Sequence, residues 1–280
     1  MRAEDTMTYK VLALDLDGTT LAPDTSMTEA TKNGINRALE AGVTVVFCTG
    51  RCKDELHELV ANFPKMRYAV CENGVYVWDV VTDSYVDYRG LDRQVSDRIL
   101  AAMQGYDVLI QIGMGGKYYL QEDYLERVWE FGLGEYHDLL AETGGIAPDL
   151  MEAYQNYGKP VSKVNFYFNN KSDRSEVFRA LEKEQLPIFL LSGLADNIEM
   201  TSTSAGKDVG LRALCDHLGV KAEEVIAIGD NLNDLSMLKF AGLSIAMGNA
   251  RAEVKEICDV ETLDNRHDGV AAAIEKYILR

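Results

Sequence analysis

The sequence is poor in positive charge. It contains 28 lysine and arginine residues against 45 aspartate and glutamate residues, which gives a formal net charge of −17. The field of such a chain repels phosphate backbones and anionic lipids, so neither nucleic acid nor a membrane surface is an expected partner. A small anion is compatible with this charge where a local cation and oriented backbone N–H groups bind it. Any anion site is therefore expected to be small and formed by a few neighbouring groups, and not by the overall charge of the protein.

Paired cysteines and long apolar runs are also missing. The five cysteines form an odd number and include no CxxC pair, which favours reduced thiols. The N-terminal MRAEDTMTYK lacks the apolar core of a signal peptide, and no later run reaches the length of a membrane span. We therefore expect a soluble, cytoplasmic protein. Residues 1–6 match no expected element, so translation from Met1 and translation from Met7 both remain open.

Short apolar runs alternate with amphipathic segments at both ends of the chain. The first part reads KVLALDLD, TEATKNGINRALEAG, VTVVFCTG, CKDELHELVANF and YAVCENG. The same alternation returns near Lys207 with GKDVGLRALCDHLG, VIAIGD, NDLSMLKFAG and LSIAMGN. This β-α-β order predicts an α/β fold with a doubly wound, Rossmann-like parallel sheet.

The pattern changes in the middle of the chain. VYVWDVVTDSYVDYRG is typical of a hairpin, and KVNFYFNN, PIFLLSG and NIEMTS have the alternation of strands. We expect an inserted α+β domain over residues 82–201, between two parts of a core domain at 1–81 and 202–280. Its GMGGK stretch resembles a phosphate-binding loop, but strand-like flanks favour a hairpin turn.

Polar residues follow the predicted core strands. Ligands bind at the carboxyl ends of strands in doubly wound sheets, which directs attention to these positions. The first strand ends in Asp15-Leu16-Asp17, the second in Thr49-Gly50-Arg51, and the VIAI run in Gly229-Asp230.

Three carboxylates from separate strand ends would repel one another unless a cation lay between them. Oxygen ligands without histidine or cysteine favour Mg²⁺, which takes one or two carboxylates, waters and a substrate phosphate. Asp15, Asp17 and Asp230 are therefore the predicted metal ligands.

Phosphoryl transfer would use the same sheet edge. Lys207 and Thr49 offer a cation and a hydroxyl to a phosphoryl group. A carboxylate beside Mg²⁺ is a candidate nucleophile, which predicts an aspartyl-phosphate on Asp15. Asp17, two residues later, is the candidate general acid and base, since it would protonate the leaving oxygen and then activate water.

At these residues the sequence resembles a known family. DLDGT, CTGR, the isolated Lys207 and GDNLND are similar to the four motifs of the haloacid dehalogenase-like (HAD) phosphatases, in the same order. The long insertion after the second motif resembles the type IIB cap of the Cof subfamily. The resemblance implies a HAD core whose inserted α+β cap controls substrate specificity.

The resemblance also implies roles for individual residues. Asp15 would be the nucleophile and a Mg²⁺ ligand, Asp17 would bind the metal through its carbonyl, and Asp230 would complete the metal site. Asp234 would orient Lys207 or a metal-bound water, and Arg51 would face either the substrate or the cap. The implied phosphate- or substrate-binding residues are Thr49, Gly50, Arg51, Lys207 and Asn233.

Other readings of these residues stay open. Each motif taken alone is an ordinary turn or helix cap, and Lys207 alone is an ordinary solvated lysine. The expected activity is hydrolysis of small phosphorylated metabolites such as sugar phosphates. A phosphomutase and a non-catalytic sensor of phosphorylated ligands are the alternatives, since a fold does not determine a function.

Overall fold

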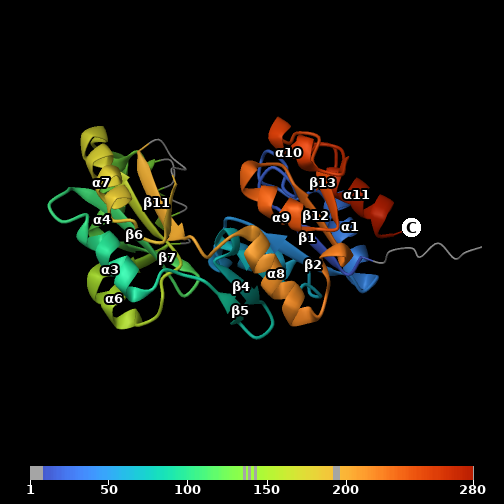
Figure 1. The fold of residues 1–280 in the computed structure, drawn as a ribbon, viewed down its shortest axis with the longest axis horizontal. Coiled ribbons are helices and arrows are strands. Elements are labelled where there is room, and N and C mark those ends of the chain that lie inside the picture. Colours follow the sequence, from blue (N-terminus) through green and yellow to red (C-terminus); the bar gives the residue numbers. More distant parts are fainter. Residues whose placement is uncertain (1–8, 135–136, 138–139, 142–143, 192–195, 280) are drawn as a thin grey trace, which may run out of the picture. The chain divides into compact units, whose positions relative to one another are not determined.

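The structure is a computed structural model that describes residues 9–134, 137, 140–141, 144–191 and 196–279 (Figure 1). The choice between Met1 and Met7 as the start lies outside the described residues. The chain forms two compact units. The core unit comprises Met1–Arg51, Leu56–Tyr88 and Gly206–Arg280, and the inserted unit comprises Cys52–Glu55 and Arg89–Ala205.

The core unit contains a sheet with the strand order β14-β13-β12-β1-β2-β3-β4-β5. The pairs from β14 to β3 are parallel, whereas β4 and β5 add to the sheet antiparallel. Its strands are β1 (Val11–Leu14), β2 (Thr44–Cys48), β3 (Tyr68–Cys71), β4 (Tyr76–Asp79), β5 (Ser84–Tyr88), β12 (Val225–Gly229), β13 (Leu243–Ala246) and β14 (Val260–Glu261). The chain runs outward from β1 in one direction and later outward from β12 in the other. The junction of β1 and β12 is therefore the switch point at which such sheets bind ligands.

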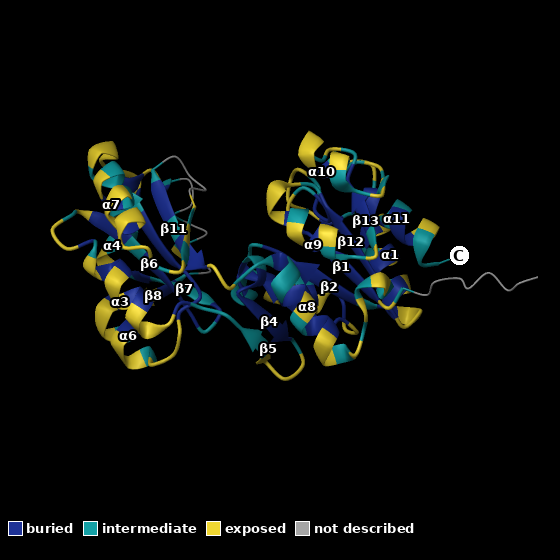
Figure 2. Cartoon of the chain, viewed as in Figure 1, coloured by how far each residue is buried: buried dark blue, intermediate teal, exposed yellow. Residues whose placement is uncertain are grey.

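The central strands are buried on both faces, as a parallel sheet covered by helices requires. Every residue of β1, β3 and β12 is buried (Figure 2). On one face, Val11 and Ala13 pack with Leu211, Leu214 and Met237 of the covering helices. The helices of this unit are α1 (Glu29–Glu40), α2 (Lys53–Ala61) from Leu56 onward, α8 (Lys207–Leu218), α9 (Leu235–Phe240), α10 (Ala252–Ile257) and α11 (Gly269–Tyr277), with the short helices η1 (Glu72–Gly74), η4 (Ala222–Glu224) and η5 (Leu232–Asp234).

The predicted hairpin belongs to the core sheet. β4 pairs with β3 and β5 pairs with β4, so the turn between them joins two strands of one sheet. The expected domain boundary at residue 82 falls inside this turn, whereas the long segment of the inserted unit runs from Arg89 to Ala205. The shift follows from backbone pairing, which continues the sheet through β5.

The inserted unit contains a second sheet with the strand order β10-β11-β9-β6-β7-β8. Its strands are β6 (Val108–Met114), β7 (Lys117–Gln121), β8 (Gly145–Ala147), β9 (Val164–Phe168), β10 (Ile188–Leu191) and β11 (Asn197–Ser202). The GMGGK stretch is the turn of the β6–β7 hairpin, as the strand-like flanks predicted. Its helices are α3 (Arg93–Ala101), α4 (Glu122–Arg127), η2 (Val128–Phe131), α6 (Leu150–Tyr157) and α7 (Lys171–Lys183).

One face of this second sheet forms a hydrophobic core with the helices. Ile112, Phe166 and Met200 of the sheet pack with Ile99 of α3 and Leu181 of α7. These observations confirm the predicted fold class, a doubly wound parallel sheet with an inserted α+β unit. All five cysteines are free thiols, in agreement with the expectation of reduced cysteines. Among the described residues, no helix combines the length and the apolar character needed to cross a bilayer.

Candidate active site

The chain turns sharply at the carboxyl end of β1. The Asp15 N–H donates to the Ile228 carbonyl at 3.1 Å, which extends the pairing of β1 with β12 by one residue. The Leu16 carbonyl then accepts hydrogen bonds from the N–H groups of Thr19, Thr20 and Leu21 at 3.2, 3.0 and 2.9 Å. This turn leaves Asp15 buried, whereas the Asp17 side chain is 55% exposed.

Gly18 allows the turn to lie against Asp230. Its φ is +88°, and a Cβ at this position would lie 2.5 Å from Asp230 Oδ2. Only glycine combines that conformation with so close an approach. Thr19 Oγ1 donates to Asp230 Oδ1 at 2.9 Å, so the turn after β1 holds the carboxylate that follows β12.

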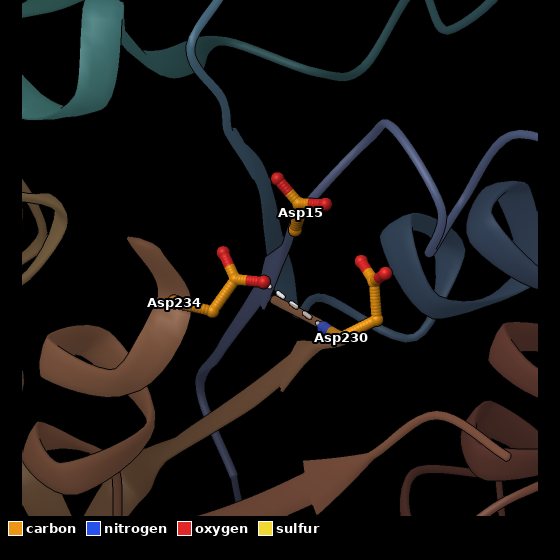
Figure 3. Close-up of side chains that lie close together, drawn as sticks. All are labelled: Asp15, Asp230 and Asp234. Atoms are coloured by element: carbon orange, nitrogen blue, oxygen red, sulfur yellow. Dashed lines mark hydrogen bonds between the residues drawn. The ribbon is translucent and has the colours of Figure 1, made fainter. Parts of the chain in front are cut away.

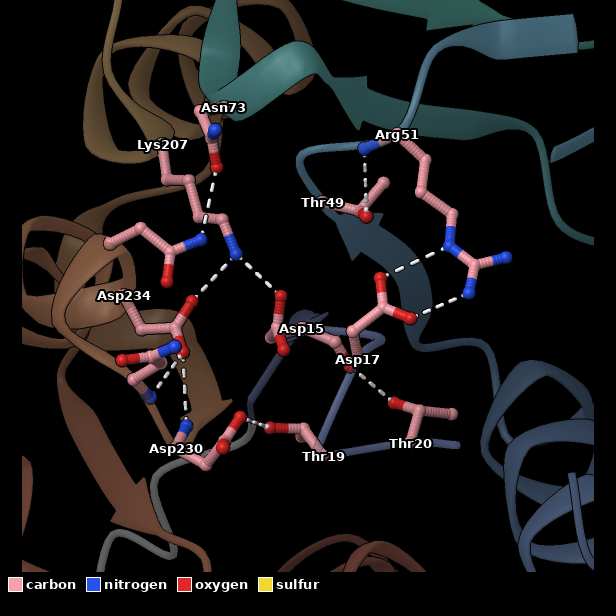
Figure 4. Close-up of polar contacts among 12 residues, drawn as sticks. Asp15, Asp17, Thr19, Thr20, Thr49, Arg51, Asn73, Lys207, Asp230 and Asp234 are labelled. Carbon is pink, nitrogen blue, oxygen red and sulfur yellow. Dashed lines mark hydrogen bonds and ion pairs between the residues drawn. The ribbon is translucent and has the colours of Figure 1, made fainter. Parts of the chain in front are cut away.

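Lys207 is the first residue of α8 and is buried. Its Nζ donates to Asp15 Oδ1 at 2.5 Å and to Asp234 Oδ1 at 2.6 Å (Figure 4). A buried ammonium is tolerated where carboxylates pair with it. Burial by itself lowers the pKa of Lys207, but the charges of Asp15 and Asp234 outweigh that effect and raise it. Lys207 therefore stays charged.

Burial disfavours the charged forms of the carboxylates around Lys207. Burial raises the pKa of Asp15 to about 7, although the Lys207 charge opposes the shift. Burial also raises the pKa of Asp230, against the hydrogen bond from Thr19. One ammonium does not neutralise three carboxylates, so the site favours a further cation.

The oxygens of Asp234 are all engaged. Oδ2 accepts from the N–H groups of Asp230 and Asn231 at 2.9 and 3.0 Å, and Oδ1 accepts from Lys207. Asp234 is completely buried. This arrangement suits a residue that orients its neighbours.

Carboxylate oxygens of Asp15, Asp230 and Asp234 lie within 4.8 Å of one another (Figure 3). Opposite ligands of Mg²⁺ lie about 4.2 Å apart, at twice the usual magnesium–oxygen distance. Oδ2 of Asp15 and Oδ2 of Asp230 accept no protein hydrogen bond in the part of the chain that the structure describes. The donor set and its spacing therefore fit a hard divalent cation.

The Asp17 carboxylate lies outside this cluster. Arg51 binds it through two hydrogen bonds, Nη2 to Oδ1 at 2.5 Å and Nε to Oδ2 at 3.0 Å (Figure 4). The structure thus brings Asp234, and not the Asp17 carboxylate, to Asp15 and Asp230. The Asp17 side chain points away from the other two carboxylates. If Asp17 binds the metal, its backbone carbonyl is therefore the group that would do so.

Backbone hydrogen bonds join the loop after β2 to the turn after β3. Thr49 is buried, and its Oγ1 accepts from the Arg51 N–H at 3.1 Å. The Glu72 N–H donates to the Arg51 carbonyl at 3.0 Å, and the Asn73 N–H donates to the Thr49 carbonyl at 2.8 Å. Gly50 lies between these two anchored residues.

The turn after β3 is strained and tightly packed. Glu72, Asn73 and Gly74 have φ values of +48°, +54° and +91°. A Cβ on Gly74 would lie 1.9 Å from the carbonyl oxygen of Gly206, the residue before Lys207. Such strain persists only where the surroundings hold it in place. The turn connects the Thr49 loop with the start of α8.

Two supporting residues were given no role from the sequence. Thr19 holds Asp230, and Asn73 accepts a hydrogen bond from Asn233 Nδ2 at 3.1 Å. Thr19 is part of the DGT motif and Asn73 follows a core strand, so the position after a parallel strand was the available signal. Their partners come from distant parts of the chain and were not predictable.

The sequence profile of the haloacid dehalogenase-like hydrolase family matches residues 12–274. The chain is 27% identical over 275 residues to the 5-amino-6-(5-phospho-D-ribitylamino)uracil phosphatase YcsE of Bacillus subtilis, with 96% of each chain covered. It is 25% identical over 281 residues to the pyridoxal phosphate phosphatase YbhA of Escherichia coli, with 98% of this chain and 100% of the relative covered.

Solved structures show the same fold. A haloacid dehalogenase-like hydrolase from Bacteroides thetaiotaomicron superposes with a TM-score of 0.80 at 27% identity, over 96% of this chain and 99% of the other. A HAD subclass IIB sugar phosphatase superposes with a TM-score of 0.72 at 20% identity, over 96% of this chain and 98% of the other. The resemblance seen in the motifs is confirmed, and the chain belongs to the haloacid dehalogenase-like hydrolase family.

Proposed function

We propose that the protein is a Mg²⁺-dependent phosphatase that hydrolyses small phosphorylated metabolites in the cytoplasm, through an aspartyl-phosphate on Asp15. The observation that carries the proposal is the cluster around Lys207, in which the ammonium contacts Asp15 and Asp234, and Asp230 has a carboxylate oxygen within 4.8 Å of oxygens of both. A solvated lysine or an ordinary turn does not produce a buried cluster of this kind.

In the first step, Asp15 Oδ attacks the phosphorus and the bond from phosphorus to the ester oxygen breaks. Asp17 donates a proton to the leaving oxygen, which departs as an alcohol. Lys207 and Thr49 hold oxygens of the phosphoryl group, and Asn233 is a further proposed contact of that group. Asp234 keeps Lys207 in position through the contact at 2.6 Å.

In the second step, the Asp17 carboxylate takes a proton from water and the water oxygen attacks the phosphorus. The acyl phosphate bond breaks, which releases inorganic phosphate and restores the Asp15 carboxylate. Asp15 and Asp230 would hold Mg²⁺, together with the Asp17 carbonyl. The bound cation supplies positive charge against the phosphoryl oxygens.

We assign the selection of substrate to the inserted unit, which we propose acts as the cap expected over residues 82–201. Arg51, which binds the Asp17 carboxylate in this structure, is the core residue proposed to face the substrate or the cap. The names of YcsE and YbhA describe phosphatases of small phosphorylated compounds, which supports the same class for this chain. Sugar phosphates are our proposed substrates.

The test is phosphate release by the purified full chain from p-nitrophenyl phosphate and a panel of sugar phosphates, with Mg²⁺ and with EDTA. We expect turnover that requires Mg²⁺ and falls at least about a thousandfold in Asp15→Asn. Asp216→Asn, an exposed change on α8, is the matched control. Turnover unaffected by Asp15→Asn would refute the nucleophile.

Two further outcomes separate the alternatives. Incorporation of oxygen from labelled water into the released phosphate is expected for a phosphatase, whereas a phosphomutase would return the phosphoryl group to a sugar. Binding of phosphorylated compounds without any turnover would identify a non-catalytic sensor.

A further inference from the structure

Strand β10 forms one edge of the sheet in the inserted unit. It is the first strand in the strand order, and in the part of the chain that the structure describes it pairs with β11. The Thr203 N–H donates to the Pro187 carbonyl at 3.0 Å, and hydrogen-bonded pairs alternate along antiparallel strands. Phe189 and Leu191 therefore bond to β11, whereas Leu190 directs its N–H and its carbonyl to the open edge.

The side chains along this edge are apolar and uncharged. Phe189 and Leu191 point to the same face of the sheet, and each is 46% exposed. The sequence of residues 185–195, QLPIFLLSGLA, has no charged residue, although 26% of the whole chain is charged. An exposed apolar edge of this kind is a template for pairing with another strand.

The other edges of the two described sheets are shorter or carry charge. β8 has three residues, and β14 has two, one of which is Glu261. β5 carries Asp87. Short strands and charged side chains are usual protections of a sheet edge. The four-residue β10 has no charged residue, so it is the least protected of these edges.

Charge near β10 does not oppose the approach of a second copy. The charged residue of β11 is Glu199, and Lys163 Nζ lies 3.3 Å from its Oε2. Neighbouring strands lie about 4.8 Å apart, so the Glu199 residues of two copies joined at β10 would be about 14 Å apart. That separation exceeds the Debye length of about 8 Å at physiological ionic strength. Salt therefore screens the repulsion between them.

The edge is complementary to itself about a twofold axis at Leu190, perpendicular to the sheet. In antiparallel pairing about this axis, Leu190 exchanges two N–H···O hydrogen bonds with Leu190 of a second copy. Phe189 then lies opposite Leu191 of the second copy, in a pair without hydrogen bonds, where side chains come closest. The symmetry repeats this contact, so all four exposed apolar side chains are covered.

The neighbouring registers fit less well. An axis at Phe189 would require the Ile188 N–H for a hydrogen bond between copies, but that N–H already donates to the Leu186 carbonyl at 2.8 Å. An axis at Leu191 would place Phe189 opposite position 193, a glycine, which offers no side chain to cover the ring. The axis at Leu190 is therefore the register that the edge favours.

We propose that two copies of this chain associate through antiparallel pairing of β10 with β10 in this register, which joins their six-stranded sheets into one continuous sheet. Two four-residue strands bury little surface, so the dimer is weak and forms at micromolar concentrations and above. The contact is closed, because the twofold axis uses the β10 edge of both copies.

The first test is the mass of the purified full chain in sedimentation equilibrium. Between about 1 and about 500 µM, we expect the mass to rise toward that of two chains and no further. Phe189→Lys and Leu191→Lys should each raise the dimer dissociation constant at least about tenfold, because a charge would face an apolar side chain. Leu263→Lys, at a residue of the core unit that is 54% exposed, is the matched control and should dimerise like the unchanged protein.

The second test determines the register by disulfide formation with a mild oxidant, and it serves if a lysine variant fails to fold. Directly opposite residues in a pair without hydrogen bonds have Cα atoms about 4.5 Å apart, within the range of a disulfide. Diagonal residues lie about 7–8 Å apart, beyond that range. An equimolar mixture of Phe189→Cys and Leu191→Cys should therefore form linked dimers. Either variant alone, and the unchanged protein with its own cysteines, should not.

Four outcomes would overturn the proposal. They are a monomer at every concentration, a mass above that of two chains, a dimer that both lysine variants leave unaffected, and linkage of one cysteine variant alone as complete as that of the mixture. None of these results bears on the proposed phosphatase activity, whose residues lie in the core unit.

Discussion

Lys207 Nζ lies 2.5 Å from Asp15 Oδ1, although the two residues are 192 positions apart in the chain. The lysine comes from the first turn of α8 and the aspartate from the end of β1, and both are buried. The contact therefore joins the two parts of the core unit that flank the inserted unit in the sequence.

Lys207→Met should destabilise the protein. It leaves Asp15 and Asp234 buried without their cation, and removal of one partner from a buried ion pair costs about 3–5 kcal/mol. Urea denaturation at pH 7 without added metal would measure the free energy of unfolding. Lys239→Met, an exposed change on α9, is the matched control. Equal stability of the two variants would contradict the ion-pair argument.

Asp230→Asn should weaken Mg²⁺ binding. The substitution removes one negative charge from the cluster that Asp230 forms with Asp15 and Asp234. The asparagine side chain still offers an oxygen that can accept the hydrogen bond from Thr19. We expect the dissociation constant to rise at least about tenfold, measured by isothermal titration calorimetry without substrate. Asp216→Asn should bind Mg²⁺ like the unchanged protein, and a similar affinity in Asp230→Asn would remove this residue from the metal site.

Asp17→Asn should separate catalysis from metal binding. Loss of a general acid and base lowers kcat by about 10² to 10⁴. The Asp17 carboxylate pairs with Arg51, outside the acidic cluster, so the Mg²⁺ dissociation constant should change less than in Asp230→Asn. Steady-state kinetics and the same calorimetry provide the measurement. A variant with normal kcat would exclude Asp17 as the proton donor.

Gly74→Ala should destabilise the protein more than Gly42→Ala. Both glycines have positive φ, +91° and +87°, and an alanine there costs about 1–2 kcal/mol in backbone strain. A Cβ at position 42 meets nothing within 4 Å, whereas one at position 74 would collide with Gly206. The difference between the two variants in urea denaturation isolates the collision. An equal loss of unfolding free energy in both variants would show that backbone strain, and not the collision with Gly206, destabilises Gly74→Ala.

Asp79→Asn should lower the free energy of unfolding by an amount that depends on pH. Burial raises the pKa of Asp79, but the hydrogen bonds from Arg67 and from the N–H groups of Thr82 and Val81 outweigh it and lower the pKa below the ordinary value of 3.8. A lowered pKa means that the stabilisation is present above pH 3.8 and is lost as the pH falls through the lower folded-state value.

We expect Asp79→Asn to reduce the free energy of unfolding by about 1–3 kcal/mol at pH 7. The difference from the unchanged protein should shrink as the pH falls from 5 toward 3. Denaturation curves across that range would check the sign, and a difference that grew on acidification would contradict the assignment.

The sequence by itself was sufficient for the fold class and the family. Apolar periodicity and turn residues are local properties, so the runs VLAL, TVVFC and VIAIG predicted core strands that the structure confirms. The motifs after those strands identified the edge of the sheet that carries the polar residues, because strand polarity fixes where parallel strands end.

Tertiary structure alone decided which carboxylates meet. Asp15 and Asp17 are two residues apart, yet the turn around Leu16 buries one and exposes the other. Asp234 joins Asp15 and Asp230, while Arg51 takes the Asp17 carboxylate. The direction of a side chain and the identity of its neighbours depend on contacts between distant segments, which no local pattern records.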